Sequence, residues 1–486
     1  MKESEKNYLS REKEGFLKGN LSKFKTLIIT AGVGLLVGSQ IYNPNKRVIE
    51  AIVGSILVLM LWNFSALAAT WLVIISYPFP FSISWGNSNF IFILIILLTY
   101  LVRVSTGHYK IHLDKTISLP LLLIIASYIL SFINVPFEAE IMKNTFVNIA
   151  NFLATIVFML LIFNVVNDEE KLRKTVNIIM ITAALVILFT IVEMFFPGKV
   201  IIPNWLYTTH KTKLVMKGLR MMGPFHSYEL HGEFLAINAF LIFFKLVRSR
   251  GMAIKILLGM LLIADLLMLF ATITRGAFFS FILGIIYLIF LSRKELNITR
   301  FVYLVAAIVI VIITLEGFVA NYTTSGSLFD RVIGTTFSKG FVPDSRTGLW
   351  EAAFERGMKH PIFGQGVGWD FTKTTFKDIV WPHNLYLFYF NITGLFGLSA
   401  FLFLIYRLVR KTFAGLKSSI VTSPFPEAFM KILHIVIIIF LFDQLKIEYL
   451  RNNKYTFFIW LIFGLIAATK NVIDKNRRER EMPAPS

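Results

Sequence analysis

The chain has 486 residues, of which 56% are hydrophobic and 16% are charged, and its mean hydropathy is +0.68. A soluble globular protein carries about a quarter charged residues, so this composition excludes an ordinary soluble enzyme and indicates a membrane protein. The net charge of +20 is typical of proteins that bind nucleic acid or anionic lipid, and also of membrane proteins with basic cytoplasmic loops. The positions of the Lys and Arg residues along the chain distinguish these classes. Because the chain has no cysteine, disulfides and cysteine metal sites are excluded.

Long apolar runs predict membrane-spanning helices, since a helix needs about 20 apolar residues to cross the hydrocarbon. In chain order the eleven clear runs are Ile91–Leu101, Ile117–Ile133, Val147–Val165, Val176–Phe196, Phe234–Phe244, Ile256–Ala271, Ala277–Leu291, Phe301–Leu315, Leu385–Ile405, Ile432–Phe442 and Phe457–Ala468. Before Pro78 the pattern is ambiguous, because Leu27–Ile41 is short and Val48–Ser76 is either one tilted span or two short ones. We predict an all-α, polytopic transmembrane helix bundle of about 12–14 spans.

The Lys and Arg residues are dense in alternate loops and sparse in the loops between them. Because basic loops stay on the cytoplasmic side, we expect both termini in the cytoplasm and an even number of spans in the plasma membrane. The predicted organisation is a cytoplasmic segment at 1–25, a transmembrane bundle at 26–317, an extracellular loop with an amphipathic helix at 318–384, C-terminal spans at 385–470 and a cytoplasmic tail at 471–486.

The loop at 318–384 is the longest polar stretch, and loops of this length are usually functional or disordered. Asp344 or Ser345 is a suitable cap for a helix running from Arg346 towards Met358. The glycines Gly364, Gly366 and Gly368 that follow lack the strand and helix of a dinucleotide-binding unit. We expect these glycines to permit tight turns or close approach to a ligand.

Two histidines and two carboxylates lie close together at the start of the run Phe234–Phe244: His226, Glu229, His231 and Glu233. They could ligate a divalent metal, but they match no zinc spacing and straddle the start of a span, so we expect no metal site here.

Several motifs of the exterior segments resemble one family. His383-Asn384 is followed after nine residues by Gly394-Leu395-Phe396-Gly397, which resembles the His-Asn-x9-Gly-x-x-Gly signature of the O-antigen ligase and polymerase family. Arg346–Trp350 and Pro361–Gly366 resemble the Arg-x-x-x-Trp and Pro-x-x-Gly-x-Gly stretches of that family. Arg220–Phe225 and Thr272–Gly276 resemble the two external arginine segments of the family. His226-Ser227-Tyr228 departs from the Asn- or Pro-containing stretch of many relatives.

The resemblance implies glycosyl transfer from a polyprenyl-diphosphate-linked glycan to a glycan or lipid acceptor hydroxyl, outside the membrane, with inversion and without metal, nucleotide or other cofactor. His383 is the catalytic candidate, because a neutral imidazole can take the hydroxyl proton, although a lone histidine at a span entrance is also a common interfacial residue. The candidates for binding diphosphate or substrate are Arg220, Arg275, Arg346 and Asn384. Arginine binds phosphate oxygens bidentately, but each of these arginines alternatively reaches to head groups or anchors its own helix.

A transporter or flippase of lipid-linked oligosaccharides is the alternative function, although few charges lie within the spans. The basic residues follow loop topology, so we expect membrane lipids and envelope-polysaccharide enzymes as partners and no nucleic acid. Polymerase and ligase are not distinguished by these residues. Composition favours a Gram-positive envelope, in which the resemblance suggests a teichuronic-acid or capsule repeat-unit polymerase using undecaprenyl diphosphate.

Overall fold

The structure is a computed structural model, and it describes residues 65–80, 82–83, 86–196, 220–293, 313–314, 316–317, 346–367 and 382–481. The chain divides into two compact units, of which the second, Ala66–Ser82 with Gly86–Ser486, holds all the helices described below. The first unit, Met1–Ser65 with Ile83–Trp85, lies almost wholly outside the described residues.

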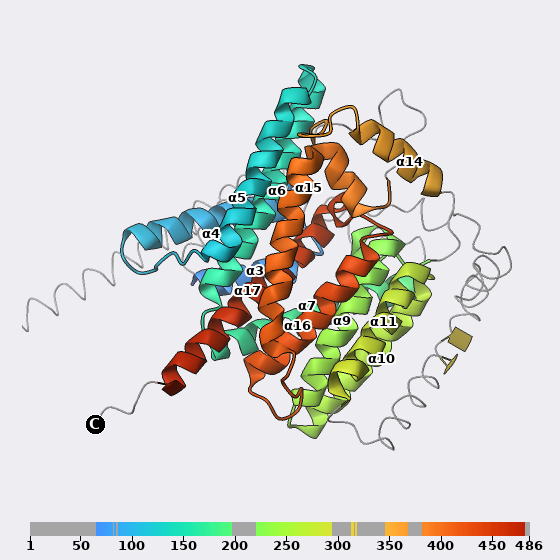
Figure 1. Ribbon diagram of the computed structural model, residues 1–486. Helices are drawn as coiled ribbons and strands as arrows, with labels where there is room; N and C mark the ends of the chain where they lie inside the picture. Colours follow the sequence, from blue (N-terminus) through green and yellow to red (C-terminus); the bar gives the residue numbers. More distant parts are fainter. Residues whose placement is uncertain are drawn as a thin grey trace, which may run out of the picture. The chain divides into compact units, whose positions relative to one another are not determined.

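Helices make up nearly all the regular structure of the described residues (Figure 1). The α-helices are α3 (Ala66–Ser76), α4 (Ser88–Ser105), α5 (Lys115–Leu130), α6 (Ala139–Val165), α7 (Glu169–Phe195), α9 (Tyr228–Arg248), α10 (Met252–Ala271), α11 (Arg275–Ser292), α14 (Arg346–Gly357), α15 (Leu385–Thr412), α16 (Phe425–Asp443) and α17 (Asn453–Glu481). Short 3-10 helices are η1 (Ser131–Asn134), η2 (Gly223–Phe225), η4 (Phe413–Gly415) and η5 (Tyr449–Arg451). Two strands of two residues each, β1 (Ser82–Ile83) and β2 (Gly86–Asn87), pair before α4.

Ten helices of the described residues are long and apolar enough to cross a membrane. They correspond to ten of the eleven predicted runs, which confirms the all-α polytopic bundle. The run Phe301–Leu315 lies almost wholly outside the described residues, as do Leu27–Ile41 and most of Val48–Ser76. The predicted total of 12–14 spans includes those segments and stays a prediction.

The spans differ in how much of their surface other helices cover. In α17, 89% of the most apolar window is buried, and in α9 and α16 78% is buried, whereas only 28% is buried in α10 and α11. In Figure 1, α9, α10, α11 and α16 lie side by side. The poorly covered apolar faces of α10 and α11 therefore suit a lipid environment.

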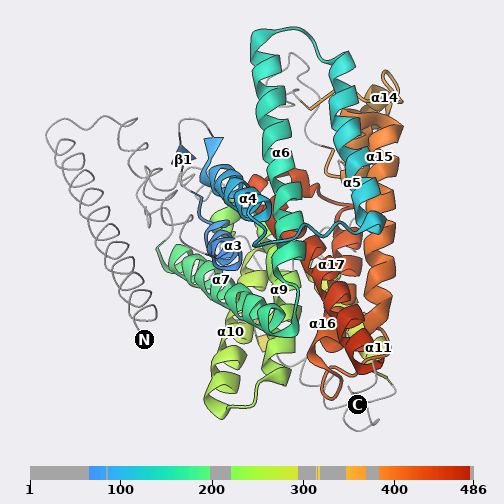
Figure 2. The same cartoon turned by 90° about the vertical axis from the view of Figure 1, so that its left-hand side faces the viewer.

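Helix α15 packs along α5, and α14 contacts α15 (Figure 2). The helix predicted within the loop at 318–384 is present as α14, and Ala353 and Arg356 lie on its buried side. Phe354 of the same helix is 53% exposed. Helix α17 continues to Glu481, into the segment predicted to be a tail. The limits of the predicted domains remain a prediction.

Candidate functional site

The segment Pro382–Asn384 leads into α15 in a well-anchored turn. The Asn384 side-chain Oδ1 caps the helix by accepting hydrogen bonds from the backbone N–H groups of Tyr386 (3.0 Å) and Leu387 (3.1 Å). The Leu385 N–H donates to the Gln444 carbonyl at 2.9 Å, in the turn after α16. Asn384 is buried, at 7% exposed, and its side-chain hydrogen bonds stabilise the turn that carries His383.

His383 faces an acidic side chain from another helix. Its Nδ1 lies 4.0 Å from Oε2 of Glu229, which belongs to the first turn of α9. Both side chains are about one-sixth exposed, at 15% and 16%. A carboxylate beside one imidazole nitrogen orients the ring and stabilises its protonated form, which leaves the other nitrogen for a reacting group. The pair has the composition of a general base and its orienting acid.

Arg220 holds the turn between α10 and α11. Its Nε donates to the Thr272 carbonyl (3.0 Å), and its Nη2 donates to the Ile273 carbonyl (2.9 Å) and to Thr274 Oγ1 (3.3 Å). The guanidinium carbon lies 3.4 Å from the centre of the Tyr228 ring, and Thr274 Oγ1 also donates to the Tyr228 carbonyl. Arg220 therefore ties the turn to the start of α9, next to Glu229.

The segment that carries Arg220 is itself anchored to α7 and α17. The Gly223 N–H donates to Glu193 Oε2 at 2.9 Å. On the other side, Lys454 Nζ donates to the Pro224 carbonyl at 2.7 Å and Asn452 Nδ2 donates to the Phe225 carbonyl at 2.5 Å. These bonds fix the backbone of this segment against two spans.

Arg275 is the first residue of α11 and directly follows the turn that Arg220 holds. Its neighbour Gly276 faces the end of α16, since a Cβ placed on Gly276 would lie 3.2 Å from Asp443 Oδ1 and 3.5 Å from Lys446 Cδ. Asp443 Oδ1 also accepts a hydrogen bond from Ser280 Oγ at 3.0 Å. Lys446 therefore adds a cation beside the start of α11.

Backbone strain gathers in the same turns. Among the described residues, the non-glycine residues with positive φ are His226 (53°), Ile273 (49°) and His383 (50°). Such conformations cost about 1–3 kcal/mol each, and a β-branched residue adopts them least readily. His226 lies three residues before Glu229, Ile273 lies two residues before Arg275, and His383 is itself strained. Backbone strain of this kind concentrates at functional sites.

The glycine motifs join the loop after α14 to a break in α15. At Gly394 the backbone leaves the helical conformation, with φ 66° and ψ −168°. The carbonyls of Asn391 and Ile392 would otherwise accept hydrogen bonds from Leu395 and Phe396. Instead they accept from the N–H groups of Gln365 (2.8 Å) and Gly366 (3.0 Å).

The N–H groups released at the same break find partners in the loop. Leu395 N–H donates to the Pro361 carbonyl (2.8 Å) and Phe396 N–H donates to the Ile362 carbonyl (3.1 Å). A Cβ on Gly364 would lie 2.4 Å from the backbone of α15, so only glycine permits this approach. Gly364 and Gly366 thus contact the backbone of α15, a role that was not expected for them, and their approach to a ligand stays a prediction. Gly368 and the side chain of Arg346 lie outside the described residues.

The sequence motifs did not identify Glu229 as the partner of His383. Glu229 appeared there only within a possible metal cluster, yet His231 and Glu233 point elsewhere. His231 Nε2 shares a hydrogen bond with Thr190 Oγ1 at 3.0 Å, and Glu233 Oε1 accepts from Gln444 Nε2 at 2.8 Å. No group of three or more potential metal ligands occurs within the part of the chain that the structure describes. The sequence carried no signal that pairs Glu229 with His383, because the two residues lie far apart in the chain and before different spans.

Residues 258–402 match the family model described as O-Antigen ligase. The matched segment contains Arg275, Arg346, His383 and Asn384, and it begins after Arg220. No curated protein matches the chain. The ten apolar helices and this match indicate a multi-pass membrane protein in which residues 258–402 are similar to an O-antigen ligase domain.

Proposed function

We propose that the protein transfers a glycan from a polyprenyl-diphosphate carrier to an acceptor hydroxyl, at the turns that carry His383, Glu229, Arg220 and Arg275. The observation that carries the proposal is the convergence of three distant segments, in which the His383–Glu229 pair meets the arginine-held turn before α11. A base beside a cationic turn suits a reaction in which a hydroxyl loses its proton while a diphosphate gains charge.

In the proposed reaction, His383 takes the proton of the acceptor hydroxyl, and that oxygen attacks the anomeric carbon of the donor. The bond from the anomeric carbon to the diphosphate oxygen breaks, and the diphosphate leaves with the electron pair. Attack from the face opposite the leaving group inverts the anomeric centre. Arg275 and Lys446 stabilise the charge on the diphosphate, while Arg220 holds the turn and adds positive charge beside it. The reaction needs no metal.

We place this reaction at the exterior face of the plasma membrane. The opposite ends of the helices are basic, since the last turns contain Lys245 and Arg248 in α9, Arg410 and Lys411 in α15, and Arg478 and Arg480 in α17. The positive-inside rule assigns those ends to the cytoplasm. His383 precedes the other end of α15, so this argument supports an exterior site and cytoplasmic termini.

The test uses purified full-length protein in vesicles with a polyprenyl-diphosphate-linked oligosaccharide, an acceptor glycan and EDTA. We expect a new glycosidic product and release of polyprenyl diphosphate. We expect His383→Ala to lower the rate of transfer about 10²- to 10⁴-fold. A ladder of products identifies a polymerase, and a single transfer identifies a ligase. The control is His360→Ala, because His360 is exposed in the loop after α14.

Equal rates in wild type and His383→Ala would overturn the assignment of the base. Movement of the intact donor across the vesicle without bond formation would support the transporter. A Gram-positive capsule or teichuronic-acid product is the finer proposal, and the chemical structure of the ladder repeat tests it.

A further inference from the structure

A charged cavity lies at the end of α15 opposite His383. Its volume is about 260 Å³, and its walls come from the α4–α5 loop and from α6, α15 and α17. Its lining includes Asp114, Phe163, Lys411, Lys470 and Asp474. Because Lys411 lies in the last turn of α15, the cavity opens at the basic end of the spans.

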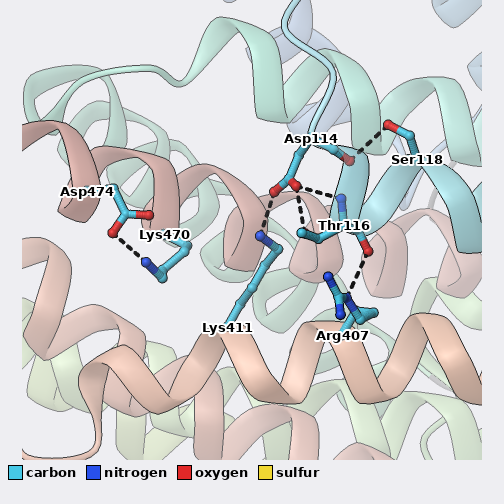
Figure 3. A network of polar contacts seen from close by, with 7 residues as sticks. All are labelled: Asp114, Thr116, Ser118, Arg407, Lys411, Lys470 and Asp474. Atoms are coloured by element: carbon cyan, nitrogen blue, oxygen red, sulfur yellow. Dashed lines mark hydrogen bonds and ion pairs between the residues drawn. The ribbon is translucent and has the colours of Figure 1, made fainter.

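Two ion pairs form the polar wall, and Figure 3 shows them side by side. Lys411 Nζ lies 2.5 Å from Asp114 Oδ2, and Lys470 Nζ contacts Asp474 Oδ1 one turn further along α17. The four side chains are 14% to 39% exposed, so they are neither sealed in the core nor fully hydrated. Their charges therefore act on a ligand with less screening than those of surface pairs.

The geometry of the first pair is preorganised. Asp114 Oδ1 accepts hydrogen bonds from the Thr116 backbone N–H (2.9 Å) and from Thr116 Oγ1 (2.6 Å). The Thr116 carbonyl in turn accepts from Arg407 Nε at 3.2 Å, one turn before Lys411 on α15. These contacts, drawn in Figure 3, fix the carboxylate and leave each ammonium with N–H donors beyond the one used in its pair.

The cavity presents two carboxylates and two ammonium groups, and this balance selects the ligand. A simple anion would meet repulsion from Asp114 and Asp474, and a simple cation would meet repulsion from Lys411 and Lys470. A group with both signs can satisfy each. Apolar surface adjoins the charges, because Phe163 lines the cavity and Leu113 and Ile111 of the same loop are 65% and 45% exposed. Such surface suits the glycerol and acyl part of a lipid.

We propose that this cavity binds the head group of an ethanolamine phospholipid from the leaflet at the basic end of the spans. Its phosphate oxygens accept hydrogen bonds from Lys411 and Lys470, and its ammonium donates to Asp114 and Asp474. The site lies beyond the glycosyl-transfer reaction and does not depend on it. A phosphocholine group fits less well, because its trimethylammonium has no N–H donor for the carboxylates.

The experiment measures the apparent unfolding temperature of the full chain in detergent against increasing short-chain phosphatidylethanolamine, phosphatidylcholine or phosphatidylglycerol. Ligands that bind the folded state raise this temperature in a concentration-dependent way. We expect a response to phosphatidylethanolamine at lower concentration than to the other two. Lys470→Met with Asp474→Asn should weaken it about a hundredfold, because the variant removes two charge-assisted hydrogen bonds that each contribute about tenfold.

The matched control is Lys475→Met with Glu479→Gln, which removes another i,i+4 pair of α17, 4.0 Å apart and more than half exposed. This control should keep the wild-type response. Equal responses to the three lipids, or an unchanged response in the Lys470/Asp474 variant, would overturn the proposal. Free O-phosphoethanolamine is a further arm, and binding as tight as that of the lipid would assign the cavity to a soluble compound instead.

Discussion

His383 Nδ1 lies 4.0 Å from Glu229 Oε2, with the histidine before α15 and the glutamate in the first turn of α9. The two residues belong to separate spans, and each is held by its own local structure. Asn384 caps α15 directly after His383, and Ser227 Oγ caps α9 two residues before Glu229. Each member of the pair is thus positioned by the cap of its own helix, although the two residues lie far apart in the sequence.

Replacing Glu229 by Gln should slow glycan transfer by about tenfold to a hundredfold, less than removal of His383. The amide keeps the shape of the side chain but loses the charge that stabilises a protonated His383. Glu229→Asp should retain more activity than Glu229→Gln, since it keeps the charge. The measurement is the rate of product formation in vesicles. Glu355→Gln, on the exposed side of α14, is the control, and an equal loss there would refute a specific role for Glu229.

Replacing Arg220 by Lys should lower both the transfer rate and the stability of the protein. Lysine keeps the charge but cannot reach the carbonyls of Thr272 and Ile273 together, as the planar guanidinium does. The expected loss of stability is about 1.5–3 kcal/mol, the range for hydrogen bonds to charged groups. Thermal unfolding in detergent measures it.

The control for this change is Arg293→Lys at the far end of α11, where the guanidinium carbon lies 4.5 Å from the centre of the Phe290 ring. Arg293 is exposed, so its replacement should change the unfolding temperature little. If Arg220→Lys unfolds at the wild-type temperature, Arg220 does not hold the turn.

Replacing Gly394 by Ala should destabilise the junction between α15 and the loop after α14 by about 2–4 kcal/mol. The added Cβ would lie 2.2 Å from the Ile362 carbonyl oxygen, and the backbone conformation is one that only glycine adopts readily. Gly259→Ala in α10 is the contrasting variant, because its Cβ would meet no atom within 4 Å. That variant should gain about 0.5–1 kcal/mol. Equal unfolding temperatures for the two would contradict the role of Gly394.

Asp114 should contribute stability at neutral pH that is lost in acid. Burial raises the pKa of the Asp114 carboxyl, but hydrogen bonds from Lys411 and Thr116 outweigh this effect, and the pKa lies below its ordinary value of 3.8. The contribution is therefore complete above the unfolded value and is lost as the pH falls from there through the folded pKa.

Two variants separate the ion pair from the helix cap at this position. Asp114→Asn keeps a capping oxygen but loses the charge, and Asp114→Ala loses both, at a further cost of about 1 kcal/mol. Unfolding temperatures should therefore fall in the order wild type, Asn, Ala at neutral pH. Between neutral pH and pH 3 wild type should lose more stability than Asp114→Asn, and parallel pH curves would contradict the contribution of the charge.

The spans and their type could be read from the sequence, because a run of about 20 apolar residues has few stable states other than a helix in lipid. Helix α14 could also be predicted from the sequence, because a capping residue precedes Arg346 and Pro361 follows the end of the helix. The motif from His383 to Gly397 indicated the segment that matches the O-antigen ligase model, because all of its residues lie close together in the sequence.

Only the tertiary structure assigned partners across the bundle. Glu229 meets His383, Arg220 reaches the carbonyls of the α10–α11 turn, and the loop at Pro361–Gly366 fills the break at Gly394. These contacts join segments distant in the chain, and helix periodicity carries no information about which faces of separate helices meet. The sequence by itself determined a basic, multi-span helical protein with its family motifs. The packing of α9, α11, α15 and α16 decided which of those residues form one site, because side-chain contacts between spans depend on their relative rotation and depth.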